Sequence, residues 1–257
     1  MESRGTDSRA GDFPEGDRLM RPAQRIAFAA AASLAIAIGA ASVIRTADAG
    51  AAPSNASVLL SDKGTFKILV NGQQVGKEEF EIGQNGSDWF AHGTSEVQSP
   101  DGPVHISGTL QFRADGTPLH YQWSTEGKKK ASAAITFSNL TATIETQMEG
   151  AKPYTQQFTF NSSPIAILDN NLYHQYAVLA HLYDREKKGP QTFSVLVPQS
   201  LTPGTVTVDS LGMQDVSGKK LEELTVKTND LEIDLYLDNG KLMRLVAPGN
   251  NAEIVRN

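Results

Sequence analysis

His174, His181 and Asp184 are the residues that first suggest chemistry in this sequence, because imidazole and carboxylate groups are common metal ligands. The two histidines stand seven residues apart in a segment with helical periodicity. A helical metal site places its histidines four residues apart, as in His-Glu-x-x-His, and the sequence has no such pattern. Both histidines also project away from the apolar side of this helix, onto a solvated face. We therefore predict a structural or surface role for them and no metal site.

A nucleophile with a partner base is equally hard to find. The sequence has no cysteine, which excludes disulfide bonds, thiolate zinc sites, cysteine nucleophiles and a lipid-acylated cysteine. It also has no G-x-S-x-G motif of the serine hydrolases. Neighbouring carboxylates occupy positions typical of the solvated face of a strand, namely Glu78 with Glu79, Glu222 with Glu223, and Glu232 with Asp234. The sequence thus predicts a protein that is not an enzyme and uses no cofactor.

Arg244 is a charged residue that the pattern places among apolar ones. Leu231–Leu237 has an aliphatic residue at every second position, and Asn239-Gly240 is the strongest hairpin signal in the chain. A two-residue loop there pairs Leu235 with Arg244 on the apolar face. A guanidinium on that face must meet an acid, line a wet cavity, or stand at the rim with its stem on the apolar surface. The sequence leaves a ligand-facing role, an internal ion pair and a rim position open.

Length, composition and charge narrow the class of protein. The chain has 257 residues, of which 39% are hydrophobic, enough for the packed core of one domain. Lys and Arg number 23 against 29 Asp and Glu, which gives a net charge of -6. Nucleic-acid binding requires a concentrated basic face, and none is visible in the sequence. We therefore expect no nucleic-acid partner.

The N-terminal part of the chain predicts export. Ile26–Ile44 is a 19-residue stretch without a charge, and Ala47-Asp48-Ala49 offers the small residues that a signal peptidase requires. Cleavage before Gly50 is one interpretation, and an uncleaved signal anchor is the other, because this length can span a bilayer. Both place the rest of the chain in the periplasm or outside the cell, with membrane contact only through this segment.

These features divide the chain into four parts. Residues 1–25 form a disordered n-region, with Met20 as an alternative start, and residues 26–49 form the signal peptide or anchor. Residues 50–64 are a linker, and residues 65–257 are a single β domain.

The exported part alternates apolar and polar residues between regularly spaced turn signals, which indicates an all-β domain. The turn at Asp115-Gly116 sets one register: Phe112 faces Leu119, Leu110 faces Tyr121, and Gly108 faces Trp123. A ring lying across a glycine compensates for the missing side chain. We predict a dozen or so strands in a curled antiparallel meander, a β-roll or half-barrel.

One segment has a different period. In Asp169–Lys188 the residues Leu172, Tyr176, Leu179 and Tyr183 recur at helical spacing and form one apolar stripe. Asp169 or Asn170 supplies the N-cap, and Gly189-Pro190 stops the helix. A single amphipathic helix among many strands is expected to cover the open side of a curved sheet.

The order of these features resembles an uncharacterised family of bacterial periplasmic β domains. The resemblance covers nearly all of the exported part, through FKILVNGQQVGKEEFEI, LQFRADGTPLHYQW, DNNLYHQYAVLAHLYD, FSVLVPQSLTPGTVTV and LEIDLYLDNGKLMRLV. More remotely, the sequence is similar to the spiral β-roll of glycolipid-binding proteins and to the lipoprotein-carrier fold. That resemblance implies a curved sheet that wraps a helix and encloses an apolar cavity.

Two functions follow as expectations. The first is an envelope protein that binds an apolar or amphiphilic ligand, such as a lipid or glycolipid, between sheet and helix. For this function we expect a site formed by Arg244, Leu235, Trp123, Tyr121 and Tyr176. The second is a non-catalytic structural or protein-interaction module with a solid interior. An apolar pocket of several hundred Å³ beneath the helix distinguishes them, whereas the oligomeric state cannot be predicted from this sequence.

Overall fold

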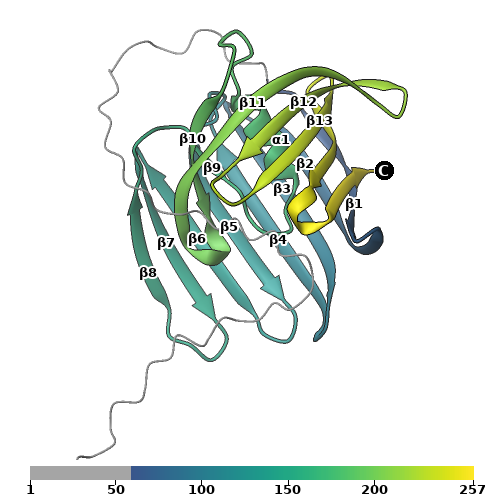
Figure 1. The fold of residues 1–257 in the computed structure, drawn as a ribbon. Helices are drawn as coiled ribbons and strands as arrows, with labels where there is room; N and C mark the ends of the chain where they lie inside the picture. Colours follow the sequence, from purple (N-terminus) through teal and green to yellow (C-terminus); the bar gives the residue numbers. More distant parts are fainter. Residues whose placement is uncertain (1–58) are drawn as a thin grey trace, which may run out of the picture.

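The computed structural model describes residues 59–257, which form one largely antiparallel sheet of fifteen strands with one short α-helix (Figure 1). The expected signal segment and n-region lie outside the described residues. The strands of the first half are β1 (Asp62–Val70), β2 (Gln73–Asn85), β3 (Asp88–Ser99), β4 (Gly102–Phe112), β5 (Pro118–Glu126), β6 (Ala131–Ser138), β7 (Thr141–Met148) and β8 (Tyr154–Thr159). Those of the second half are β9 (Ile165–Ile167), β10 (Gln191–Val197), β11 (Thr202–Val216), β12 (Lys219–Lys227), β13 (Glu232–Asp238), β14 (Lys241–Ala247) and β15 (Ala252–Arg256).

The strand order shows how the chain crosses the sheet. It runs β8-β7-β6-β5-β4-β3-β2-β1-β15-β14-β13-β12-β11-β10-β9, so the first and last strands are neighbours in the middle. Only β9 and β10 pair in parallel. The sheet is not closed, because β8 and β9 are its two edges. The mainly-β prediction with many strands and one helix is confirmed, and β1 begins at Asp62, within the segment expected to be a linker.

Turn chemistry fixes most of the register that the sequence predicted. Leu110 lies opposite Tyr121, and Gly108 lies opposite Trp123, as expected. Phe112 faces Pro118 instead of the predicted Leu119. The loop is longer than two residues: the N–H of Gly116 donates to the Arg113 carbonyl at 2.8 Å, and the N–H of Arg113 donates to the Thr117 carbonyl at 2.9 Å. A turn of this kind adds a bulge to the hairpin.

The helix α1 (His174–Leu182) is shorter than the predicted segment Asp169–Lys188. Asn171 has a positive φ of 65°, which a helix does not tolerate, so the chain turns before the helix begins. At the other end Tyr183 is already extended, with φ -68° and ψ 117°. Neither boundary matches the predicted caps.

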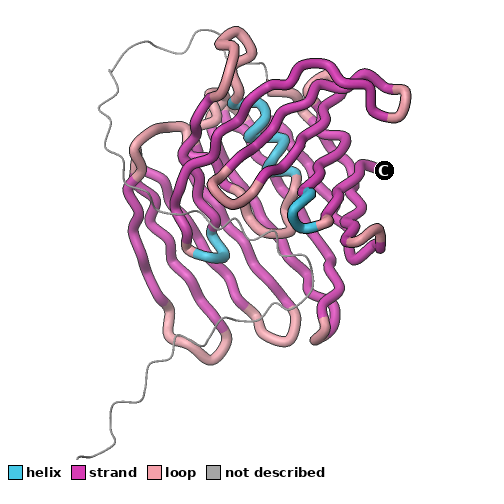
Figure 2. The backbone as a smooth tube through the Cα atoms, in the orientation of Figure 1, coloured by secondary structure: helices cyan, strands magenta, loops and turns pink. Residues whose placement is uncertain are grey.

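Helix α1 lies between two parts of the sheet, approaching β3 on one side and β14 on the other (Figure 2). The predicted stripe is confirmed as core, because its four residues are between 0% and 2% exposed: Leu172, Tyr176, Leu179 and Tyr183. The prediction of a solvated face is wrong for His174, which is fully buried, and His181 is partly buried. The helix is covered from both sides, so it has no fully solvated face.

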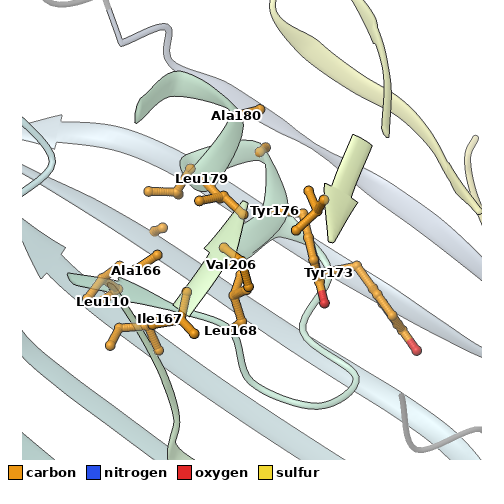
Figure 3. Packing of buried hydrophobic residues seen from close by; sticks show 14 of the residues in the cluster. Leu110, Ala166, Ile167, Leu168, Tyr173, Tyr176, Leu179, Ala180 and Val206 are labelled. Atoms are coloured by element: carbon orange, nitrogen blue, oxygen red, sulfur yellow. The ribbon is translucent and has the colours of Figure 1, made fainter. Parts of the chain in front are cut away.

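The space beneath the helix is filled with side chains. Figure 3 shows Tyr176 and Leu179 of α1 in one cluster with Leu110 of β4, Ile167 of β9 and Val206 of β11. Further aromatic and aliphatic side chains of this core are at most 1% exposed, including Phe66, Ile68, Phe112, Tyr121, Ile135, Ile144, Leu168 and Tyr173. The described interior is therefore a packed core. Within it, α1 is nine residues long, and no described helix has the length and apolar character needed to cross a bilayer.

An ion pair holds the middle of the sheet together. Arg256 of β15 donates from both terminal nitrogens to the carboxylate of Asp62 on β1, at 2.8 and 2.7 Å. The two side chains are 12% and 6% exposed. The guanidinium also lies over the Phe80 ring, 5.4 Å from its centroid. This pair links the first and last strands beside the aromatic part of the core.

Candidate functional site

The most concentrated set of polar side chains lies at the start of α1, where the helix meets the inner face of the sheet. Glu78 of β2 accepts hydrogen bonds from the backbone N–H groups of Tyr173 at 2.8 Å and His174 at 3.3 Å. Its Oε1 atom also lies 2.5 Å from Nδ1 of His174, and both side chains are fully buried. A carboxylate from the sheet thus satisfies N–H groups that the first turn leaves without partners.

Aromatic rings also enclose the imidazole of His174. Its ring stacks on Phe80, with centroids 6.0 Å apart and planes inclined by 8°. Phe80 in turn stacks on Phe66 at 4.8 Å. Nε2 of His174 is buried without a hydrogen-bond partner among the described residues. Gly93 of β3 makes this arrangement possible, since a Cβ atom there would lie 2.5 Å from the imidazole ring.

A second polar group lies close by. The hydroxyl of Tyr121 on β5 donates to Oδ2 of Asp169 at 2.6 Å, and Nε2 of Gln175 donates to that hydroxyl at 3.1 Å. Asp169 also accepts the N–H of Asn170 on Oδ1 at 3.1 Å. Asp169 was expected to cap the helix, but its carboxylate instead joins the turn before α1 to the sheet.

Burial changes the acidity of these groups. Loss of solvent raises the pKa of Asp169 to about 7, although the hydrogen bonds from Tyr121 and Asn170 oppose the change. Burial also raises the pKa of Tyr121 well above its usual value, and the nearby carboxylate of Asp169 adds to that effect. At the other end of α1, burial lowers the pKa of His181 to about 4, with a smaller contribution from Arg185.

Pairs of a carboxylate with an imidazole or a phenol transfer protons in some enzymes, but here the pairs have no contact with solvent. Every side chain of the two groups is buried: Glu78, Tyr121, Asp169, His174 and Gln175. A substrate cannot reach them without movement of α1. Among the described residues there is also no cluster of three or more potential metal ligands. What the network can do in this arrangement is fix the start of α1 on strands β2 and β5.

The sequence-predicted ligand residues fall into three places. Tyr121, Tyr176 and Leu235 are buried in the core and line no opening there. Trp123 is partly buried at the edge of that core. Tyr121, Trp123 and Leu235 share the inner side of the sheet, and Tyr176 of α1 packs in the same core. Tyr121 lies in the sealed network instead of facing a cavity.

Arg244 is on the opposite side of the sheet from its predicted position. The register shifts between Tyr236 and Leu237, so that Leu235 pairs with Leu245, and Arg244 pairs with Tyr236. The extra residue of this bulge turns Arg244 to the outer face. There its Nε donates to Glu253 at 2.7 Å, with the two side chains 35% and 38% exposed. The prediction that Arg244 shares the apolar face with Leu235 is therefore wrong.

Glu78 and His174 are the functional candidates that sequence reasoning missed. Glu78 was assigned with Glu79 to a solvated strand face, and this is wrong for Glu78 because it alternates with Phe80 and Ile82 on the inner side. That alternation was a usable signal. Nothing in the sequence indicates that His174 meets Glu78, since 96 residues separate them.

A row of side chains on the inner face, here called the trough, runs from the core toward the edge strand β8. Trp123 of β5, Ala133 of β6, Thr146 of β7 and Tyr154 of β8 lie in one cross-strand row. Ala133 is only 5% exposed, so the accessible part of the row is its Tyr154 end, which strand spacing sets about 14 Å from Trp123. Tyr154 is 52% exposed, and Met148 beside it is 47% exposed. In Figure 1 this end of β5–β8 extends beyond the strands β9–β11.

The outer face has a different character. Three hollows of about 540, 420 and 470 Å³ lie over β2–β7 and the turns at one end of these strands. Most of their lining residues are polar, and two of them share Ser107 and Ser124. The third is also lined in part by Trp123, Ala133 and Thr146. Helix α1 contributes to none of the three. They are shallow depressions in a solvated sheet face, not the apolar pocket expected beneath the helix.

Comparisons with known proteins found a solved structure of low similarity. No protein-family model matches the chain, and no curated protein matches it. A solved structure of a DUF1089 family protein from Pseudomonas aeruginosa matches with a TM-score of 0.46 and 10% sequence identity. The match covers 69% of this chain and 91% of that chain. It assigns neither a ligand nor an activity.

Proposed function

We propose that the protein is a non-catalytic binding protein of the cell envelope that holds an apolar or amphiphilic molecule, such as a lipid or glycolipid. The observation that carries the proposal is the trough between Trp123 and Tyr154. In this proposal the sheet acts as an open β-roll around α1, and the ligand lies on the uncovered end of its inner face. It does not enter the space beneath the helix.

The chemistry of the trough supports this ligand class. Tyr154 and Met148 provide exposed apolar surface to an acyl chain, and the partly buried ring of Trp123 borders it. The indole N–H of Trp123 is buried and has no acceptor among the described residues. An oxygen of a bound headgroup or sugar would satisfy that donor if the indole turned toward the ligand.

A second candidate function is favoured by the packed interior. A structural or protein-interaction module needs no cavity, and the described core is filled by side chains whose polar groups mostly pair with one another. The protein would then act only through its surfaces. The experiment below separates the two functions.

The test uses the only two tryptophans of the sequence, Trp89 and Trp123. Trp89 pairs with Phe112 near the other end of the strands, far from the trough. A brominated fatty acid that binds in the trough quenches the fluorescence of Trp123 by contact. We expect saturable quenching in the wild type and in Trp89→Phe, and its loss in Trp123→Phe.

Native mass spectrometry, read together with the quenching, decides between the functions. Native mass spectrometry of the protein purified from its own envelope is expected to detect a bound lipid, with less of it in Tyr154→Ala. Equal quenching in Trp89→Phe and Trp123→Phe would place the fatty acid elsewhere. Absence of both quenching and a co-purified lipid would reject the binding function in favour of the interaction module.

A further inference from the structure

The two edges of the sheet are protected very differently. β9 has three residues, all buried, and the N–H of the following Leu168 donates to Leu196 at 3.1 Å. β8 has six residues, of which four are exposed and none is buried. No described strand lies beyond it. An exposed edge of this length offers a row of free backbone groups to another chain.

The backbone geometry shows which groups of β8 are free. The N–H of Phe160 donates to the Leu140 carbonyl at 2.7 Å, on the side of β7. Backbone groups alternate in direction along an antiparallel strand, so Phe158, Gln156 and Tyr154 also face β7. The N–H and C=O groups of the intervening residues Thr155, Gln157 and Thr159 therefore point away from the sheet.

The usual protections of an edge strand are missing from β8. Natural edges carry charged side chains, prolines or bulges that prevent pairing with other chains. The sequence has no Asp, Glu, Lys or Arg from Pro153 to Leu168. Its prolines in that stretch lie outside the strand, and the pairing of β7 with β8 continues without a register shift.

We propose that β8 is a self-association site, at which a second copy of this chain adds its own β8 in antiparallel orientation about a two-fold axis through Gln157. Such a contact is self-complementary. It places Gln157 opposite Gln157 of the second copy and Thr155 opposite Thr159. Like pairs of Thr and of Gln form favourable cross-strand contacts, since their side chains both donate and accept hydrogen bonds.

The second copy fits this edge better than a charged peptide does. Antiparallel pairing matches uncharged residues with uncharged residues along the whole strand, whereas the protein as a whole carries a net charge of -6. Two copies that pair through β8 therefore bring no charged side chains of this strand against one another. A contact through one strand per copy is small, so the dimer is expected to be weak, with dissociation in the micromolar range or above.

The proposal goes beyond the binding function and does not depend on it. The free backbone groups of β8 point away from the sheet, and the Gln157 side chain is on the outer face, opposite the trough. A protein that dimerises without binding the fatty acid would refute the proposed function alone. A protein that binds the fatty acid as a monomer would refute the self-association alone.

Charge substitutions at Gln157, the residue on the proposed two-fold axis, test the dimer. Sedimentation velocity of the protein expressed from its full sequence, over a range from about 1 to 500 µM, is expected to show a reversible dimer. Gln157→Lys and Gln157→Glu each place like charges opposite one another, so each should weaken the dimer by tenfold or more. A mixture of the two variants should restore a heterodimer at least as tight as the wild type. Restoration by opposite charges distinguishes pairing at Gln157 from general loss of folding.

Gln147→Lys is the matched control, because Gln147 is an exposed residue of β7 that lies away from the edge. It should leave dimerisation unchanged. The proposal would be overturned by a wild type that stays monomeric at every concentration, or by dimerisation of Gln157→Lys at the wild-type level. A wild-type dimer that the mixed variants fail to reproduce would overturn the pairing about Gln157.

Discussion

The carboxylate of Glu78 accepts the backbone N–H of Tyr173 at 2.8 Å, across 95 residues of sequence. One buried side chain of the sheet thus anchors the first turn of the only α-helix in the described part of the chain. The same carboxylate contacts the imidazole of His174. Glu78 of β2 is therefore one of the residues that set the position of the helix, together with Tyr121 of β5.

Replacement of Glu78 tests this dependence. Glu78→Ala leaves two backbone N–H groups and the His174 imidazole without their buried partner, so the free energy of unfolding should fall by about 3 kcal/mol or more. Glu79→Ala removes a neighbouring carboxylate that is 61% exposed and should change it by less than about 0.5 kcal/mol. Urea denaturation measures both. Equal losses would show that Glu78 does not anchor the helix.

Gly93 provides an independent test of the same contact. In Gly93→Ala the new methyl group would lie 2.5 Å from the His174 ring and 2.9 Å from the Glu78 carboxylate. Overpacking of this kind costs about 1–3 kcal/mol. Gly249→Ala is the control, because nothing lies within 4 Å of its new methyl group. Thermal denaturation should show a lower Tm for Gly93→Ala alone, and an unchanged Tm would mean that α1 can move away freely.

Asp169 should make stability depend on pH. Burial raises its folded-state pKa to about 7, above its ordinary value of 3.8. The folded protein therefore holds this proton more tightly than the unfolded chain does. The resulting stability is fully present below pH 3.8 and is lost as the pH rises through about 7. The loss is at most about 4 kcal/mol.

Asp169→Asn separates this carboxyl from other titrating groups. The amide is uncharged at every pH and can still accept the hydrogen bond from Tyr121. Urea denaturation between pH 5 and pH 8 should therefore show a smaller loss of stability in the variant than in the wild type. Parallel curves for the two proteins would show that Asp169 does not titrate in this range.

The two arginines near the C-terminal strand should respond differently to the same substitution. Arg256→Met leaves Asp62, whose side chain is 6% exposed, without its main partner, and should lower the free energy of unfolding by about 3 kcal/mol. Arg244→Met removes a partly exposed pair with Glu253 and should change it by less than about 1 kcal/mol. It should also leave fatty-acid quenching unchanged. A larger effect for Arg244 than for Arg256 would contradict this assignment.

Local turn chemistry explains which parts of the fold could be predicted. The pairings of Leu110 with Tyr121 and of Gly108 with Trp123 followed from the Asp115-Gly116 turn, because a short turn fixes the residues opposite one another. Arg244 was misplaced because a bulge between the turn and the strand shifts the register by one residue. The residue types at that position do not indicate a bulge.

The candidate site was harder to predict because it depends on contacts between distant segments. The alternation of Glu78 with Phe80 and Ile82 already placed a carboxylate on the apolar face. Its partners are Tyr173 and His174 at the start of α1, and no pattern in one sequence pairs those two regions. The burial of His174 likewise follows from the second part of the sheet covering the helix, which helical periodicity alone cannot indicate.

The pairing of β1 with β15 has a consequence for how the protein is made. Among the described strands, β15 leaves the ribosome last, yet it lies between β1 and β14 in the middle of the sheet. Until Ala252–Arg256 has emerged, the strands on either side of it can form two separate sheets but cannot join. Synthesis of all the described strands therefore precedes completion of the sheet, and slow closure is expected for contacts so far apart in sequence.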